Sequence, residues 1–200
     1  MSCIFRLFRR EPPIVIVYPP INDYKGAGCF FHDDKHCLAG YQPRKKFPLI
    51  SGIGGNKERN EVYVYTAFRE LIEELFEPRI PIPGELINLL GNKIKYHDVH
   101  VTKGYVILDY GFDDLVKILK LCKQFGLKTP LYKTFPLTLH QVIHNRIPMY
   151  SSEISHFALI PMILYRDTSV IVQKDFIRDI RSILQKHASP KEHEESHEKK

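Results

Sequence analysis

Three glutamates are spaced so that one helix would bring them together. Glu70, Glu73 and Glu74 stand at positions i, i+3 and i+4, and at about 100° per residue their side chains converge on one helix face. Like charges on neighbouring turns destabilise a helix by roughly 0.2–0.5 kcal/mol per pair, and locally only the pairing of Arg69 with Glu73 relieves this repulsion. A hard dication such as Mg²⁺ or Mn²⁺ would compensate, because it takes oxygen ligands and keeps waters that a phosphate can displace. An acidic stripe alone is also typical of a solvated helix face, so the neighbouring residues must decide.

The helix that must position these glutamates is predicted from Val62 to Phe76. Its apolar side chains recur at spacings of four, three and four, through Val64, Phe68, Leu71 and Leu75. Asn60 is the one good N-cap residue nearby. Pro78 should end the helix, since proline disfavours right-handed helical geometry at Glu77.

The residues around the helix follow a longer pattern. Gly55 is followed after five residues by Glu61, and after seven more by Arg69, Glu70, Leu71, one residue, Glu73 and Glu74. This order resembles the Nudix box, G-x5-E-x7-R-E-U-x-E-E-x-G-U, where U is a bulky aliphatic residue. Every specified position from Gly55 to Glu74 is filled, but Phe76 replaces the last glycine and Glu77 the last aliphatic. Phenylalanine takes a left-handed cap less readily than glycine, so we expect this helix to end differently.

The resemblance implies a fold and a division of roles. The fold would be a Nudix-type α/β/α sandwich with a mixed sheet, in the α/β (α+β) class that alternating strands and helices also indicate. By resemblance Glu73 and Glu74 are the main metal-binding carboxylates, Glu70 binds metal or acts as general base, and the Gly54 carbonyl is a further ligand. Arg69 would orient the carboxylates and Glu61 would support them. A further acidic ligand from a distant loop is common in the family, and the spacing does not choose among Glu153, Asp109 and Asp113.

The function implied is a Mg²⁺- or Mn²⁺-dependent pyrophosphohydrolase that cleaves a nucleoside diphosphate derivative. Residues 1–59 carry +5 of the net charge of +6, which favours a long polyanion. The 5′ cap of messenger RNA is therefore the preferred specific substrate, also because Nudix proteins of large DNA viruses include decapping enzymes. A basic group flanking the glycines could bind phosphates or an RNA backbone, or could be a solvated loop: Arg44, Lys45, Lys46, Lys57 and Arg59. The alternative from another class is a non-catalytic Nudix-like module that binds a nucleotide or RNA.

The remaining elements are predicted from periodicity and from proline and glycine positions. Strands are expected at Ile14–Tyr18, in a hairpin over residues 26–41, within Val99–Tyr110 and at Phe157–Tyr165, and further helices at Asp113–Gln124, Leu137–Asn145 and Lys174–His187. Residues 1–188 should form one domain. Residues 189–200 contain no large apolar side chain and are expected to be a disordered tail.

Two minor motifs in the hairpin have plain structural explanations. Cys29, His32, His36 and Cys37 could bind zinc but lack paired spacing, so the hairpin is favoured over a metal site. Phe30, Phe31 and Tyr41 could stack on a base, although aromatic residues in a hairpin are more often core. Four cysteines form no disulfide framework, and no apolar run approaches the ~20 residues of a membrane span. We therefore expect a soluble, intracellular protein, cytoplasmic by preference, with no visible signature of its oligomeric state.

Overall fold

A seven-stranded mixed sheet lies between two layers of helices in the computed structural model, which describes residues 20–45, 48–149, 152–163 and 172–188. The strands are β1 (Gly26–His32), β2 (His36–Gln42), β3 (Leu49–Ser51), β4 (Ile53–Asn56), β5 (Asp98–Thr102), β6 (Tyr105–Gly111) and β7 (His156–Pro161). The main order is β3-β2-β1-β6-β5, with β4 paired to β1 and β7 paired to β2. The β1–β6 pair is parallel, and the other strand pairs are antiparallel.

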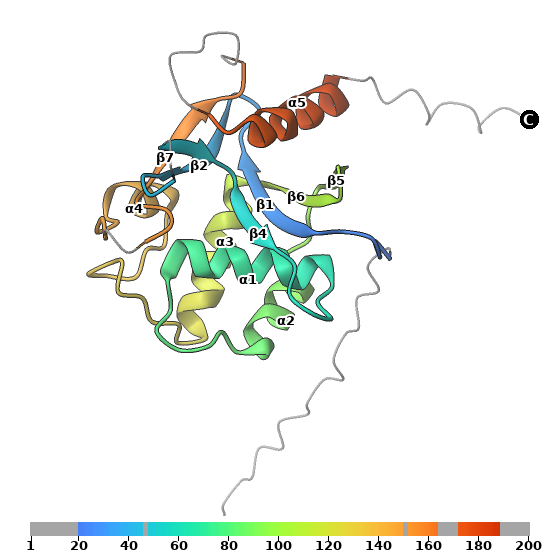
Figure 1. Ribbon diagram of the computed structural model, residues 1–200. Coiled ribbons are helices and arrows are strands. Elements are labelled where there is room, and N and C mark those ends of the chain that lie inside the picture. The colour runs from blue at the N-terminus through green and yellow to red at the C-terminus, as the bar shows by residue number, and fades with distance from the viewer. Residues whose placement is uncertain (1–19, 46–47, 150–151, 164–171, 189–200) are drawn as a thin grey trace, which may run out of the picture.

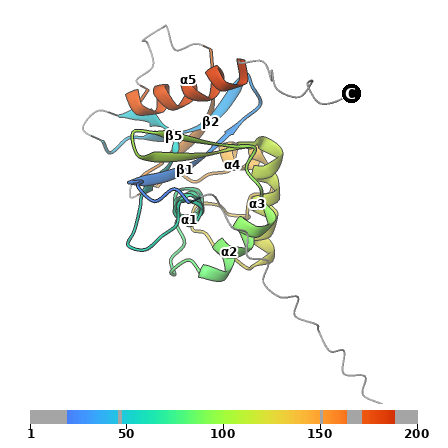
Figure 2. The same cartoon turned by 90° about the vertical axis from the view of Figure 1, so that its right-hand side faces the viewer.

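The helices are α1 (Tyr63–Phe76), α2 (Gly84–Lys93), α3 (Phe112–Gln124), α4 (Leu139–His144) and α5 (Lys174–Ala188). Figures 1 and 2 show α1, α2 and α3 on one face of the sheet and α5 on the other. The predicted α/β/α sandwich with a mixed sheet is therefore confirmed. None of the described helices is long and apolar enough to cross a membrane.

Alternation along the central strands divides the core into two layers. Cys29 and Phe31 of β1 pack toward α1, whereas Phe30 packs toward α5 against Phe176. On β6, Leu108 likewise belongs to the α1 layer and Ile107 to the α5 layer. Successive residues of a strand point to opposite faces, so β1 and β6 supply side chains to both layers.

The predicted hairpin over residues 26–41 is confirmed, since β1 and β2 pair with His32 opposite Cys37. Phe30 and Phe31 are buried in the core, while Tyr41 is exposed. Cys29 and Cys37 are buried in different core layers, so the structure does not bring together the four residues of the weighed zinc motif.

Two element predictions were incomplete. The segment Val99–Tyr110 forms two strands, because Lys103 and Gly104 take positive φ angles and turn the chain between β5 and β6. Helix α2 was missed, although Leu86, Ile87 and Leu90 are buried on one of its faces.

The other predicted elements have observed counterparts. The predicted helices at 62–76, 113–124, 137–145 and 174–187 correspond to α1, α3, α4 and α5, and the predicted strand at 157–165 corresponds to β7. The predicted strand at Ile14–Tyr18 and the tail 189–200 lie outside the described residues.

Helix α1 ends in a way that accommodates the altered end of the box. Glu77 takes the left-handed conformation (φ 41°, ψ 60°), and its N–H donates to the Glu73 carbonyl. Phe76, at the glycine position, stays helical and stacks on Phe135 with ring centroids 4.9 Å apart. The helix starts at Tyr63 with no side-chain cap, so Asn60 does not have the predicted capping role.

Candidate active site

Two glycines of β4 bring the strand close to the carboxylates of α1. Gly54 lies opposite Gly28 of β1 at φ +144°, and its N–H donates to Glu74 Oε2 at 2.8 Å. A Cβ at Gly54 would overlap the backbone of Gly28, and one at Gly55 would overlap the Glu70 carboxylate. Positions 54 and 55 therefore need glycine for separate reasons, one set by the backbone and one by the neighbouring acid.

The Arg69 guanidinium joins three acids of the box. Its Nε donates to Glu61 Oε1 at 2.8 Å, and its Nη1 donates to Glu70 Oε1 at 2.8 Å and to Glu73 Oε2 at 2.9 Å. Its Nη2 donates to the Asn56 carbonyl at 2.8 Å, which ties the helix to the end of β4. The planar guanidinium can serve all of these acceptors at once.

Glu61 is itself held in place from several sides. Its Oε2 accepts hydrogen bonds from Thr66 Oγ1 at 2.7 Å and from the Glu58 N–H at 3.0 Å. The hydroxyl of Tyr24 donates to the Glu61 carbonyl at 2.7 Å. Burial acts to raise the pKa of Glu61, but the hydrogen bonds from Arg69, Glu58 and Thr66 outweigh it, so its pKa lies below the ordinary value. Glu61 is therefore a fixed anion that anchors Arg69.

The protein compensates a negative charge on Glu74 or Glu70 only in part. Glu74 is 6% exposed, and burial raises its pKa well above the ordinary value despite the Gly54 N–H, with Glu153 and Glu70 adding to the rise. Burial also raises the pKa of Glu70, which the Arg69 charge and hydrogen bond partly offset. These groups do not form the solvated acidic stripe that the sequence also allowed.

Glu153, from the segment before β7, is the distant acid that the structure brings to this group. It interacts electrostatically with both Glu70 and Glu74, and it contacts Lys45 Nζ at 3.2 Å. Of the two other acids left open by the sequence, Asp109 is fully buried among histidines on the α5 side of the sheet. Asp113 is exposed at the start of α3. We refer to Glu70, Glu73, Glu74 and Glu153 as the four-glutamate cluster.

Arg146, which the sequence analysis did not single out, connects the two chain segments that carry the cluster. It is 6% exposed and donates to the carbonyls of Glu74 at 2.9 Å and Leu75 at 2.8 Å, in the last turn of α1. It also donates to the carbonyl of Ile154 at 2.7 Å, next to Glu153. No local pattern in the sequence distinguishes such an arginine from a surface one.

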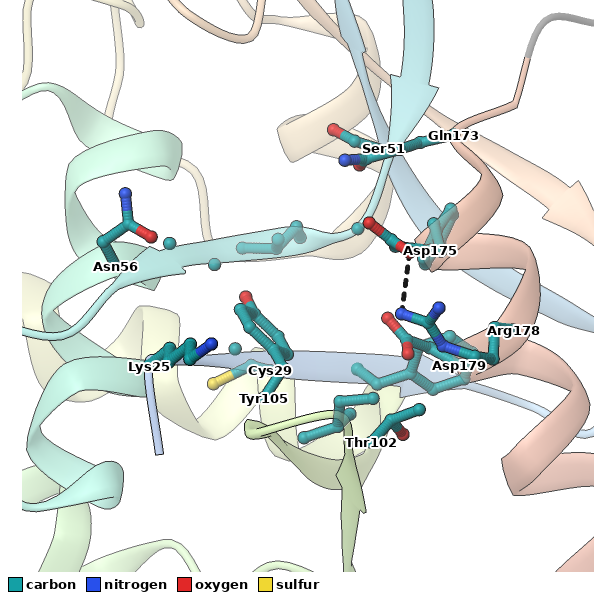
Figure 3. Close-up of a pocket in the computed structure, with 18 of the residues that line it drawn as sticks. Lys25, Cys29, Ser51, Asn56, Thr102, Tyr105, Gln173, Asp175, Arg178 and Asp179 are labelled. Carbon is teal, nitrogen blue, oxygen red and sulfur yellow. Dashed lines mark ion pairs between the residues drawn. The ribbon is translucent and has the colours of Figure 1, made fainter. Parts of the chain in front are cut away.

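A cavity of about 520 Å³ opens beside the cluster, between β4, β1, β6 and the start of α5. Gly54, Gly55 and Glu153 line it on the cluster side. In Figure 3, Asp175 and Arg178 of α5 form an ion pair on one side, facing Lys25 and Tyr105 on the other. Its volume is in the range of small-molecule sites, and its walls carry charges of both signs.

The predicted phosphate-binding residues are only partly assembled around this space. Lys45 lines the cavity, and Arg44 borders a shallower hollow with Lys45 and Glu153. Lys57 lies over the Tyr24 ring at 4.2 Å from its centroid, and Arg59 is exposed. Lys46 lies outside the described residues. Lys25 and Arg178 were missed, since their place on the cavity depends on strand pairing and on the docking of α5.

The four-glutamate cluster has the donor chemistry of a hard dication site. Its side chains offer carboxylate oxygens alone, which Mg²⁺ and Mn²⁺ prefer. The buried Glu74 carboxylate has Gly54 as its hydrogen-bond donor, and Glu70 and Glu153 lie near enough to repel it. The donor chemistry of these residues therefore suits a dication, which would remove the repulsion that burial strengthens. Their carboxylate oxygens are not drawn as close together as the ligand atoms of His32, Asp34 and His187, the group among the described residues whose ligand atoms all lie within 4.8 Å of one another.

Comparison with known proteins gives a likeness of fold. No family model matches the chain, and neither does any curated protein sequence. A NUDIX hydrolase from Nitrosomonas europaea is 12% identical, with 82% of this chain and 90% of that chain covered and a TM-score of 0.41. A bifunctional NMN adenylyltransferase/ADP ribose pyrophosphatase from Francisella tularensis is 15% identical, with 84% and 42% covered and a TM-score of 0.45. A NUDIX-family hydrolase from Clostridium perfringens is 15% identical, with 82% and 98% covered and a TM-score of 0.37.

The neighbours from Nitrosomonas europaea and Clostridium perfringens are named NUDIX hydrolases, the family that the box pattern resembles. At such identities and TM-scores, we base no conclusion about substrate or residue roles on them.

Proposed function

We propose that this chain is a Nudix hydrolase, a Mg²⁺- or Mn²⁺-dependent pyrophosphohydrolase that cleaves the diphosphate linkage of a nucleoside diphosphate derivative. One observation carries the proposal: Glu70 and Glu74 of α1 lie against Gly55 and Gly54 of β4, with Glu153 beside them at a cavity large enough for a nucleotide. In this proposal the box residues and the distant acid form one site, although Glu153 is about 80 residues further along the chain, and Gly54, Gly55 and Glu153 are its members that line the cavity.

The proposal gives the residues of the box roles that are consistent with their contacts. Glu73, Glu74 and the Gly54 carbonyl would hold the dication, with Glu153 as a further ligand and Glu70 beside them as the general base. When bound, such an ion screens the anionic diphosphate oxygens and makes a water more acidic. Arg69 keeps Glu70 and Glu73 oriented while it stays paired with Glu61.

Proton transfer is assigned to Glu70. Its carboxylate lies against the edge of β4, held by one hydrogen bond from Arg69. Burial raises its pKa, despite the opposing effect of Arg69, which makes it a stronger base than a solvated glutamate. Glu70 would accept a proton from the attacking water as the water oxygen bonds to phosphorus. The bond from that phosphorus to the bridging oxygen would break with its electron pair on the oxygen, which leaves two phosphorylated products.

The finer proposal is that the substrate is the 5′ cap of messenger RNA. It is supported by the charge of +5 on residues 1–59 and by the lysines at the cavity, Lys25 and Lys45. A polyanion gains more from such charges than a small nucleotide does.

A panel assay tests both levels of the proposal. Phosphate-containing products would be measured with Mg²⁺ or Mn²⁺ from nucleoside triphosphates, nucleotide sugars, dinucleoside polyphosphates, ADP-ribose and capped RNA. We expect turnover of at least one, reduced about 100-fold or more by Glu73→Gln or Glu74→Gln. Glu85→Gln, which neutralises an exposed acid of α2, should leave the rate unchanged. No turnover by folded, metal-loaded protein would favour a binding module, and activity surviving both cluster variants would place the metal elsewhere.

A further inference from the structure

Three histidines from separate elements surround one buried carboxylate on the α5 side of the sheet. Asp109 of β6 is fully buried, and its Oδ1 lies 2.8 Å from His32 Nε2 at the end of β1. Its Oδ2 lies 3.3 Å from His187 Nε2 of α5 and 3.8 Å from His100 Nε2 of β5. The family box includes none of these residues, and the proposed hydrolysis uses none of them.

Strand register explains why the cluster forms. Asp109 pairs with Phe30 across β1 and β6, and His100 pairs with Ile107 across β5 and β6. Paired residues share a face and alternate residues return to it, so His32, Asp109 and His100 all point toward α5. His187 then approaches from the last turn of α5.

The hydrogen bonds fix which imidazole nitrogen of His32 is protonated. The Asp34 N–H donates to His32 Nδ1 at 3.1 Å, so this nitrogen is an acceptor and Nε2 carries the proton donated to Asp109. His187 is arranged alike, with Nε2 on Asp109 and Nδ1 facing outward. A carboxylate behind the imidazole is the usual outer shell of a metal-binding histidine, because it sets the tautomer and makes the other nitrogen more basic.

The outward nitrogens meet a third donor. Asp34 Oδ1 lies 3.4 Å from His32 Nδ1 and 3.5 Å from His187 Nδ1. The three ligand atoms all lie within 4.8 Å of one another. Two imidazole nitrogens and one carboxylate oxygen form a mixed set that suits Zn²⁺ and similar ions, unlike the all-oxygen four-glutamate cluster.

The third histidine of the cluster is not fully hydrogen-bonded. The His100 side chain is 3% exposed, and its Nε2 has no hydrogen-bond partner among the described residues. Both Asp109 oxygens are already engaged by His32 and His187. A buried polar atom left without a hydrogen bond costs free energy.

We propose that His32, Asp34 and His187 bind a Zn²⁺-class transition-metal ion, with Asp109 supporting both imidazoles from behind. The ion replaces the Asp34 N–H as the partner of His32 Nδ1. It joins the turn between β1 and β2 to the C-terminal end of α5, whose opposite end forms one wall of the cavity. The bound ion would hold the C-terminal end of α5 to the turn between β1 and β2. This proposal does not depend on the activity proposed for the four-glutamate cluster.

Calorimetric titration of the full chain with Zn²⁺, in excess Mg²⁺ to occupy oxygen sites, tests the proposal. Binding of one ion is expected, with a rise in melting temperature. Asp34→Asn and His187→Gln should each weaken binding about 10-fold or more. Their side chains are 79% and 41% exposed, so neither change threatens the fold. Co²⁺ should give a ligand-field absorption spectrum that both variants lose.

His144→Gln is the matched control, because His140 and His144 form another imidazole pair, on α4, with ring centroids 4.4 Å apart. It should leave zinc affinity and the cobalt spectrum unchanged. Absence of zinc binding by the folded wild-type chain would overturn the proposal. So would equal affinity in Asp34→Asn, His187→Gln and the wild type, or loss of binding in His144→Gln alone.

Discussion

Gly55 shows how one missing side chain determines the geometry of the proposed site. A Cβ at this position would meet the Glu70 carboxylate rather than backbone. The side chain can move aside where backbone cannot, so Gly55→Ala is expected to displace Glu70 while leaving the fold intact. A displacement of about 1 Å in a catalytic group can cost up to 100-fold in rate.

We therefore predict that Gly55→Ala lowers kcat about 10- to 100-fold, with little change in Tm. Steady-state kinetics and thermal unfolding of the same preparations would measure both. Gly84→Ala is the control, because the nearest atom to its added methyl is Tyr65 Oη at an ordinary 3.6 Å. Equal rates for the two variants would contradict the placement of Glu70.

Arg69 should be irreplaceable even by lysine. A single ammonium cannot reach Glu61, Glu70 and the Asn56 carbonyl together. We expect Arg69→Lys to reduce the free energy of unfolding by about 2–3 kcal/mol, since it leaves largely buried acids unpaired. Urea unfolding would measure the loss, with Arg79→Lys on the exposed surface as control. An unchanged midpoint for Arg69→Lys would refute this account.

At the scale of elements, the site depends on holding α1 to the segment before β7. Arg146 makes this connection through three carbonyls and no acid. Lysine has one nitrogen in place of a guanidinium fork, so Arg146→Lys would leave buried carbonyls unpaired, at about 1–3 kcal/mol each.

We predict that Arg146→Lys destabilises the protein by about 3 kcal/mol and weakens Mg²⁺ or Mn²⁺ binding, because Glu153 loses its fixed position beside Glu74. Metal titration at a temperature where the variant is fully folded separates the two effects. Unaltered metal affinity in the folded variant would mean that Glu153 is not held by this contact.

Helix α5 contributes a pH dependence through Asp179. Burial raises the pKa of this carboxyl to about 6, with Arg178 opposing the rise. The folded pKa lies above the unfolded value, so the protonated group favours folding at low pH, and this stability is lost as the pH rises through about 6.

Asp179→Asn should therefore stabilise the protein at pH 7.5, by about 1 kcal/mol after solvent screening, and should give no gain near pH 4. Chemical unfolding at the two pH values would measure this difference. Asp175→Asn, on an exposed carboxylate of the same helix, should not show the gain. A constant effect of Asp179→Asn at both pH values would contradict the burial argument.

At the scale of the whole molecule, the salt dependence of binding distinguishes a long RNA substrate from a small nucleotide. If capped RNA is the substrate, its affinity should fall about 20- to 50-fold over a fourfold rise in salt, as expected when three or four phosphates are contacted. A cap dinucleotide should show a much weaker dependence. Fluorescence anisotropy with both ligands on a Glu74→Gln protein would avoid turnover. Identical salt dependence for the two would point to a small nucleotide.

The sequence by itself determined the local part of this protein. The box lies within 20 consecutive residues, and helical periodicity alone places Glu70, Glu73 and Glu74 on neighbouring turns. Periodicity also located α1, α3 and α5 to within one or two residues. It missed α2, and it missed the Lys103–Gly104 turn that divides β5 from β6.

Only the tertiary structure decided which distant residues join the local ones. Glu153 and Arg146 reach α1 because β7 pairs with β2 and the preceding chain packs against the last helical turn. His32, Asp109 and His187 meet because strand register and the docking of α5 bring them to one face. Such contacts form because apolar surface is buried elsewhere in each element. The sequence around the polar residue therefore does not show which distant residue it will contact.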